Sequence, residues 1–127
     1  MSKSYGLSIL ALCAVLLGVG APARAHHTYV AKYDSTRLIT LSGTVSNVRF
    51  SNPHIFFELA TSGGANWTIE TESIPVARSL GLSEAMLKDG ARVTVTGWPS
   101  KEGGAEFGLK TISFADGKTI TMRKSAR

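Results

Sequence analysis

Five short segments of the chain alternate apolar and polar residues with a period of two, and this pattern constrains the fold more than any other feature. Such a period places successive side chains on opposite faces of a β-strand, so that one face is buried. The segments are residues 36–50, 54–60, 67–71, 92–98 and 107–114, with a short extension at 119–122. Turn-forming residues, mostly glycine pairs or Asp-Gly, separate several of them. The chain is therefore expected to be mainly β.

The first of these segments changes phase partway along its length. Residues 39–45 keep one alternation, whereas Val48 and Phe50 follow the other. The slip near Ser46 and Asn47 predicts a β-bulge. A long first strand that bends at a bulge can serve two halves of a sheet, which is a way for a small barrel to close.

Residues 73–88 break the strand pattern and are the only credible helical stretch of the mature chain. Pro75 suits the first turn of a helix, Gly81 interrupts it, and Ser83 can cap a second turn. Five strands with one short helix between the third and the fourth match a small OB-like, partly open barrel. A β-sandwich is the main competing architecture.

The first 25 residues have the pattern of a cleavable signal peptide. Lys3 precedes an apolar run of about 13 residues from Leu7 to Val19, and small residues lead up to Ala25. A helix needs roughly 20 apolar residues to cross a bilayer, so this run is short for a permanent span. We therefore expect cleavage after Ala25, a periplasmic or secreted protein, and no permanent membrane span.

The predicted division of the chain has four parts. They are a signal peptide at 1–25, a mature N-terminal segment at 26–35, an OB-like β-barrel domain at 36–122 and a basic tail at 123–127. Cleavage removes Cys13, the only cysteine, so the mature chain has no disulfide. It keeps 12 basic and nine acidic residues. The basic ones are scattered, so no nucleic-acid partner is expected.

No arrangement of a nucleophile with a base is visible, and we expect a binding protein and no enzyme. The chain has no Gly-x-Ser-x-Gly elbow, and its glycine pairs occur in hairpin turns without a following helix. Glu58, Glu70 and Glu72 alternate along a predicted hairpin, where a pair of carboxylates could transfer protons. The simpler interpretation places them on the solvent side, balanced by Arg49 or Arg92.

All three histidines are candidate metal ligands. Cleavage after Ala25 makes His26 the first mature residue and His27 the second. An α-amino group and the Nδ1 of the same histidine can chelate one ion, and a further imidazole suits a set of nitrogen ligands for Cu(II). His54 follows Asn52-Pro53 at the mouth of a strand, where a tethered N-terminus can reach it. The alternative is a solvated polar start to the mature chain and an ordinary strand-edge histidine.

A second hypothesis is a metal-free interaction or ligand-binding module of the cell envelope. Its binding face would carry Phe56, Glu58 and Trp98, and its partner would be an envelope protein or a saccharide. Trp98 is expected to be exposed because it precedes Pro99, whereas Trp67 is expected in the core. The opposite face of the second strand is predicted to be core and carries Ile55, Phe57 and Leu59.

Several motifs along the chain resemble those of a family of small exported bacterial proteins, domain-of-unknown-function family 6152. The motifs are His26-His27-Thr28, Tyr33-Asp34, Leu41-Ser42-Gly43-Thr44-Val45, Ser51-Asn52-Pro53-His54 and the stretch 87–97. The double histidine after the signal and the Asn-Pro-His turn are the most specific of them. The resemblance covers nearly all of the mature chain and implies export and an OB-like fold. It implies no reaction.

Overall fold

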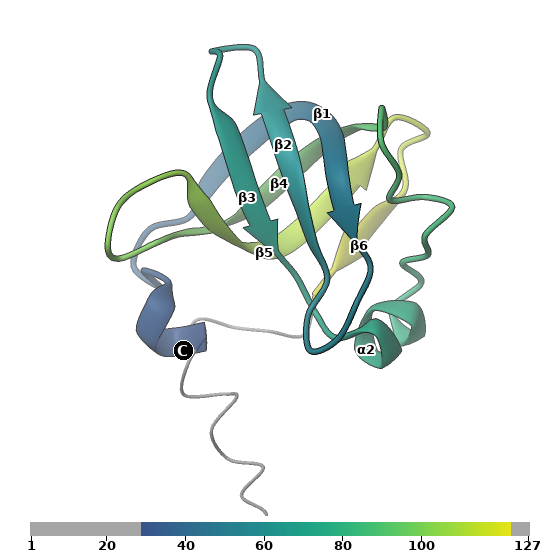
Figure 1. The fold of residues 1–127 in the computed structure, drawn as a ribbon, viewed down its shortest axis with the longest axis horizontal. Coiled ribbons are helices and arrows are strands. Elements are labelled where there is room, and N and C mark those ends of the chain that lie inside the picture. Colours follow the sequence, from purple (N-terminus) through teal and green to yellow (C-terminus); the bar gives the residue numbers. More distant parts are fainter. Residues whose placement is uncertain (1–28, 123–127) are drawn as a thin grey trace, which may run out of the picture.

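The computed structural model describes residues 29–122 (Figure 1). The predicted signal peptide, His26, His27 and the basic tail at 123–127 lie outside the described residues. Within them, no helix has the length and apolar character needed to cross a bilayer.

Strands make up most of the described chain, as the alternation predicts. The elements in order are β1 (Ile39–Arg49), β2 (Phe56–Thr61), β3 (Asn66–Glu70), α2 (Ile74–Ser79), β4 (Arg92–Pro99), β5 (Glu106–Phe114) and β6 (Thr119–Thr121). Each strand lies within three residues of its predicted position, because alternation and turn chemistry are properties of neighbouring residues.

The five main strands form a closed barrel of OB-like topology. The sheet order is β3-β2-β1-β4-β5-β6, and a further parallel pairing of β3 with β5 closes the barrel. In that pairing Thr68 lies opposite Glu106 and Glu70 lies opposite Gly108. β6 extends the sheet from β5 outside the closed ring. The OB-like fold is therefore confirmed, and the competing β-sandwich is excluded. The barrel was expected to be partly open, but the β3–β5 pairing closes it.

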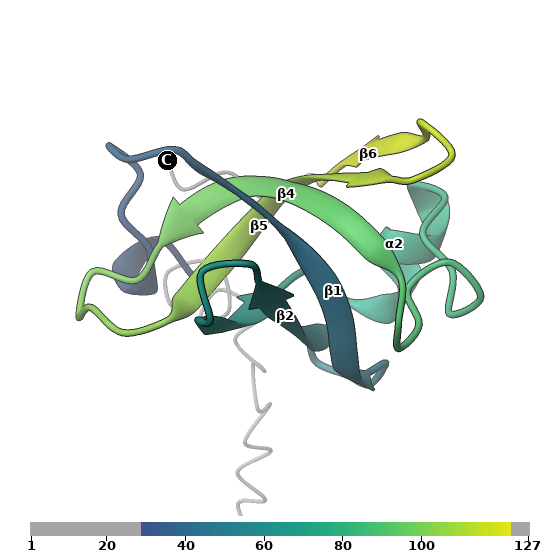
Figure 2. The same cartoon turned by 90° about the horizontal axis from the view of Figure 1, so that it is seen from above.

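β1 is bent at the predicted bulge. It pairs with β4 along its first half and with β2 along its second half, so it serves both sides of the barrel (Figure 2). Its register against β2 shifts between Ser46 and Arg49. Asn47 has a φ of 46° there, a left-handed conformation that asparagine tolerates better than most residues. The change of phase in the sequence therefore marks the bend.

The barrel interior is filled by the inward-facing residues of all five strands. β2 contributes Phe57 and Leu59, and Ile55 lies just before it; each is at most 1% exposed, which confirms the predicted core face. The main core cluster consists of Val45, Ile55, Phe57, Leu59, Ile69, Ala77, Leu82, Leu87, Val93, Val95, Phe107, Leu109, Ile112, Ile120 and Met122. Burial of each large side chain stabilises the fold by about 1.5–3 kcal/mol relative to an exposed one.

The segment between β3 and β4 covers one end of the barrel. α2 begins after Ser73 with Pro75 in its first turn, and Gly81, at a φ of +94°, ends it. The amide of Leu87 donates to the carbonyl of Ser83 at 3.0 Å, so a single turn follows where a second helical turn was predicted. Leu82 and Leu87 are buried in the core. The segment is therefore anchored by apolar side chains.

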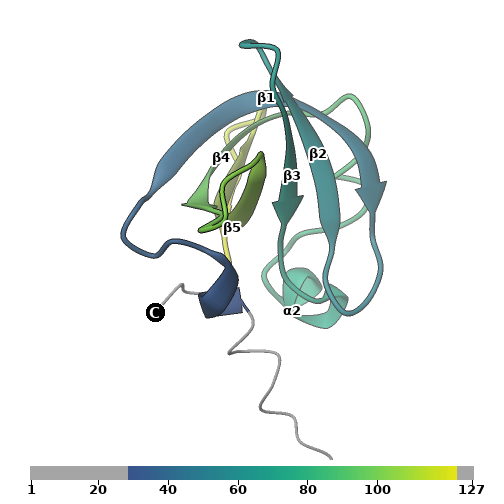
Figure 3. The ribbon, with the colours of Figure 1, turned by 60° about the vertical axis from the view of Figure 1, so that its left-hand side comes forward.

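The chain reaches the barrel through a helical turn that we call the strap, residues 29–33 (Figure 3). The loop between β4 and β5 holds it: the amide of Lys101 donates to the carbonyl of Lys32 at 2.9 Å, and Lys101 Nζ donates to the carbonyl of Val30 at 3.0 Å. Tyr33 forms an isolated bridge with Ser100. The predicted N-terminal segment is therefore partly integrated into the fold, and its helical turn shows that the prediction of a single helical stretch at 73–88 is wrong.

Candidate functional site

The strap lies on the outer face of the barrel across one row of paired residues. The strand register aligns Phe56 of β2 with Glu70 of β3, Glu70 with Gly108 of β5, and Gly108 with Trp98 of β4. The residues flanking Gly108, Phe107 and Leu109, are buried in the core, so this row points outward. An outward row is ordinarily solvated, but here the strap covers it.

Gly108 provides the space that the strap occupies. A Cβ atom at this position would collide with the hydroxyl of Tyr29 and would lie 2.9 Å from Cδ2 of Tyr33. The two tyrosine rings pack against each other with their centroids 4.6 Å apart. A glycine inside a strand often marks such a close approach of another segment.

Trp98 joins the two tyrosines in a second, smaller hydrophobic cluster. Its side chain is 7% exposed, so the expected exposure of Trp98 is wrong. The alternation correctly directs Trp98 out of the barrel, but the strap then covers it. Trp67 is partly buried against the core, as its core assignment predicts. Its ring packs edge-on against that of Phe107, with the ring centroids 6.4 Å apart.

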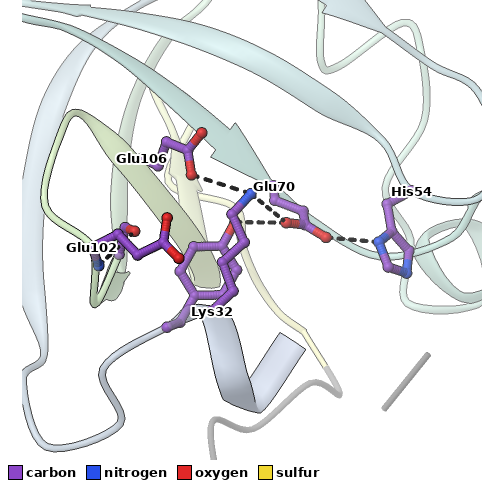
Figure 4. Close-up of polar contacts among 7 residues, drawn as sticks. Lys32, His54, Glu70, Glu102 and Glu106 are labelled. Atoms are coloured by element: carbon purple, nitrogen blue, oxygen red, sulfur yellow. Dashed lines mark hydrogen bonds and ion pairs between the residues drawn. The ribbon is translucent and has the colours of Figure 1, made fainter. Parts of the chain in front are cut away.

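The carboxylate of Glu70 is the centre of a polar network beneath the strap (Figure 4). The hydroxyl of Tyr33 donates to its Oε2 at 2.6 Å, and His54 Nδ1 lies 2.7 Å from its Oε1. Lys32 Nζ lies 3.5 Å from the same Oε2 and 3.2 Å from a carboxylate oxygen of Glu106. One carboxylate therefore joins the strap to the loop that carries His54.

The surroundings of Glu70 keep it ionised. Burial by itself raises the pKa of Glu70, but the hydrogen bonds from Tyr33 and His54 and the charges of Lys32 and His54 outweigh burial and lower the pKa below its usual value. Burial, reinforced by the negative charge of Glu70, raises the pKa of both Tyr29 and Tyr33. Both phenols therefore stay protonated, and Tyr33 acts as a donor.

Glu70 and Glu72 are buried, at 7% and 4% exposed, so their expected place on the solvent side of the hairpin is wrong. The strap and the neighbouring loops cover this end of β3, whereas alternation within the hairpin cannot reveal such a cover.

Glu58 is partly exposed, and its Oε2 accepts hydrogen bonds from the side-chain amides of Asn47 and Asn66 at 2.9 and 2.8 Å. These bonds lower the pKa of Glu58. Among residues 29–122 the ion pairs join Glu70 to Lys32 and His54 and Glu106 to Lys32, and neither Arg49 nor Arg92 takes part in them. The charge of Arg49 nevertheless helps to lower the pKa of Glu58, so Arg49 acts on this carboxylate as expected.

His54 is held in one orientation by Glu70. An ionised carboxylate can only accept hydrogen bonds, so Nδ1 of His54 carries the proton and donates it. In the neutral imidazole the lone pair then lies on Nε2, which points away from Glu70 in Figure 4. A histidine whose second nitrogen donates to a carboxylate is the usual form of a metal-ligating histidine.

Of the three candidate ligands, the described residues include only His54. Among residues 29–122 no three His, Cys, Asp or Glu side chains are grouped so that they could hold a metal ion. His26 and His27 lie outside the described residues, three and two positions before Tyr29 respectively. Tyr29 is 4% exposed, and the negative charges of Glu70 and Glu72 act on its pKa, so the strap begins close to the Glu70 network.

The three residues of the metal-free hypothesis do not share an open surface. Phe56 is half-buried, with the guanidinium carbon of Arg49 5.2 Å from its ring centroid. Glu58 lies two residues further along the same outer face of β2. Trp98 is buried in the cluster with Tyr29 and Tyr33.

Sequence reasoning did not identify Tyr33, Lys32 and Glu106 as members of the site. Two signals point to the packing of the strap on the barrel, although neither identifies Lys32 or Glu106. Tyr29 and Tyr33 are four residues apart, which is the spacing of one helical face. Gly108 occupies an outward position of a strand, where a glycine suggests close packing of another segment.

Fold and site together define a small OB-like barrel whose N-terminal strap is anchored on a buried carboxylate. Residues 14–110 match a family of unknown function, DUF6152, and the chain belongs to this family. The resemblance found in the sequence motifs is therefore confirmed. Among curated proteins, no sequence matches the chain.

Proposed function

We propose that this protein is an exported binding module that holds a transition-metal ion, copper, through its mature N-terminus. In this proposal the amine and imidazole of His26 chelate the ion, and His27 or His54 completes the set of nitrogen ligands. The observation that carries the proposal is the 2.7 Å contact between His54 Nδ1 and the buried carboxylate of Glu70.

The chemistry of His54 supports a role as a ligand. Glu70 fixes the tautomer that leaves a lone pair on Nε2, and a donated hydrogen bond to a carboxylate raises the basicity of a ligating imidazole. The side chain of His54 is 19% exposed, and that of Glu70 is 10% exposed. The orienting group is therefore shielded from water, while the imidazole keeps access to the surface.

The position of the strap supports a role for the N-terminal histidines. Tyr33 donates to the same carboxylate that orients His54. From Tyr29 the chain has three residues in which to place His26, and three extended residues span about 10 Å. A terminus tethered this close raises the local concentration of its ligands near His54.

Export is part of the proposal because the terminal amine of His26 exists only after cleavage behind Ala25. The apolar run and the small residues before Ala25 support such cleavage. On the same grounds we propose that the mature protein is located in the periplasm or outside the cell. We propose binding without catalysis, with no nucleic-acid partner.

The first test is the intact mass of the exported protein, which identifies its first residue. Cu(II) is then titrated into the wild type, His26→Ala, His54→Ala and Glu70→Gln, with affinity measured by competition and ligand nitrogens counted by electron paramagnetic resonance. We expect His26→Ala to abolish tight binding and His54→Ala to remove one nitrogen from the spectrum. Loss of an orienting carboxylate typically weakens metal binding about 10- to 100-fold, which is the expectation for Glu70→Gln.

Glu58→Gln is the matched control, because Glu58 is a carboxylate of the same hairpin that binds two asparagines and not His54. It should bind copper like the wild type. A first residue other than His26, or equally weak binding by the wild type and all variants, rules out the metal site. The metal-free envelope module then becomes the preferred interpretation.

A further inference from the structure

A groove bordered by several hydroxyl groups lies on the barrel at the end of β2 that is opposite His54. It has a volume of about 480 Å³ and is bordered by β1, β4, the end of β2 and the end of β5. Half of its lining residues carry a hydroxyl group: Ser42, Thr44, Thr61, Ser62, Thr94 and Ser113. Small-molecule sites commonly have volumes of about 300–1,000 Å³, so the groove can hold more than a single ion.

The strand register brings these hydroxyl groups together. Ser42 of β1 lies opposite Thr94 of β4, and Thr94 lies opposite Ser113 of β5. Neighbouring strands are about 4.8 Å apart, so the three side chains form a row across one face of the sheet. The hydroxyl oxygens of Ser42 and Thr94 are 2.8 Å apart.

The hydroxyl row can still donate hydrogen bonds to a ligand. Each hydroxyl has one proton, and in the Ser42–Thr94 pair only one of the two protons lies between the oxygens. The other proton can point toward a ligand. Ser113 forms a similar pair with Thr119, also at 2.8 Å, and the same reasoning applies to it.

Arg92 supplies the only charge in the groove lining. It lies opposite Thr44, next to the hydroxyl row, and it is exposed. No acidic residue lines the groove, and in the described part of the chain no carboxylate forms an ion pair with Arg92. A guanidinium beside several hydroxyl donors is complementary to a carboxylate or phosphate group.

From these observations we propose that the groove binds a small acidic saccharide through its carboxylate or phosphate group. The guanidinium of Arg92 forms charge-assisted hydrogen bonds to the anionic group, and the hydroxyl row binds the sugar hydroxyls. The size of the groove favours a saccharide over a free ion. This site is separate from the proposed metal site, because His54 precedes β2, whereas Thr61 is the last residue of β2 and Ser62 follows it.

The test is a titration of the purified ¹⁵N-labelled protein, followed by amide chemical shifts, with glucuronate, glucose and inorganic phosphate at constant ionic strength. Glucuronate should change the chemical shifts of the groove amides along a saturating binding curve. Phosphate should change these chemical shifts less. Glucose, which lacks the carboxylate, should bind at least tenfold more weakly. Arg92→Gln should weaken glucuronate binding about 10- to 100-fold, as expected for the loss of a charge-assisted contact.

Arg49→Gln is the matched control, because Arg49 is an exposed arginine that packs on Phe56 outside the groove. It should leave glucuronate binding unchanged, as should His54→Ala, so that failure of this site and failure of the metal site can be told apart. Arg92→Lys keeps the positive charge but loses the planar guanidinium that can form two parallel hydrogen bonds, so it should bind glucuronate with intermediate affinity. This variant replaces Arg92→Gln in the test if Arg92→Gln does not fold. Equal binding of glucose and glucuronate, saturation by phosphate alone, or shifts unaffected by Arg92→Gln and Arg92→Lys would overturn the proposal.

Discussion

Tyr33→Phe tests whether one buried hydrogen bond holds the strap to the barrel. The substitution removes the phenolic hydroxyl and keeps the ring, so it opens almost no cavity among Tyr29 and Trp98. Tyr33 is 1% exposed and Glu70 is 7% exposed, and the bond between them is 2.6 Å long. We expect a clear loss of stability because an ionised, buried acceptor loses its closest donor.

The magnitude follows from the charge on Glu70. A hydrogen bond to a charged group contributes about 1.5–3 kcal/mol, compared with about 1 kcal/mol for a neutral pair. Small proteins lose about 1–3 kcal/mol of unfolding free energy per molar urea, so the midpoint should fall by about 1 M. Urea unfolding followed by tryptophan fluorescence measures this shift directly.

A double-mutant cycle with Glu70→Gln separates this bond from other effects of Tyr33→Phe. In the Glu70→Gln background the acceptor is neutral, so the second substitution should cost only about 0.5–1.5 kcal/mol. A loss below about 0.5 kcal/mol in the wild-type background would refute the reasoning. An equal loss in both backgrounds would do the same, because it would show that the charge on Glu70 has no part in the bond.

Three further predictions concern the strap, the hairpin and the metal. Gly108→Ala should cost about 1–3 kcal/mol and displace the strap, seen as a red-shifted fluorescence of Trp98, whereas Gly63→Ala, which meets nothing within 4 Å, should do neither. Because hydrogen bonds lower the pKa of Glu58 from its ordinary value of 4.5, its stabilising effect should be present at pH 7 and lost as the pH falls through the lowered pKa. The difference in thermal midpoint between the wild type and Glu58→Gln should therefore shrink between pH 7 and pH 3, and a constant difference would contradict this. Cu(II) at about 100 times its Kd should stabilise the mature protein by about 2.7 kcal/mol, reversibly on chelation, with no such effect in His26→Ala.

Much of the barrel could be predicted because its signals lie between near neighbours in the chain. The alternation in the second strand identified Ile55, Phe57 and Leu59 as core, and the phase slip beside Asn47 identified the bulge of β1. The order of strands and helix then distinguished the OB-like barrel from a sandwich. The parallel pairing of β3 with β5 left no local signal, and it closed the barrel further than expected.

The sequence by itself determined where strands, bulge and turns occur and which side chains leave the barrel, because periodicity and turn chemistry act over a few residues. Only the tertiary structure decided that Glu70 and Trp98, both directed outward, are buried. Their cover is the strap, and the bond that anchors it joins residues 37 positions apart. Such a contact depends on how the closed barrel presents Gly108 and Glu70 side by side, and no local pattern contains that information.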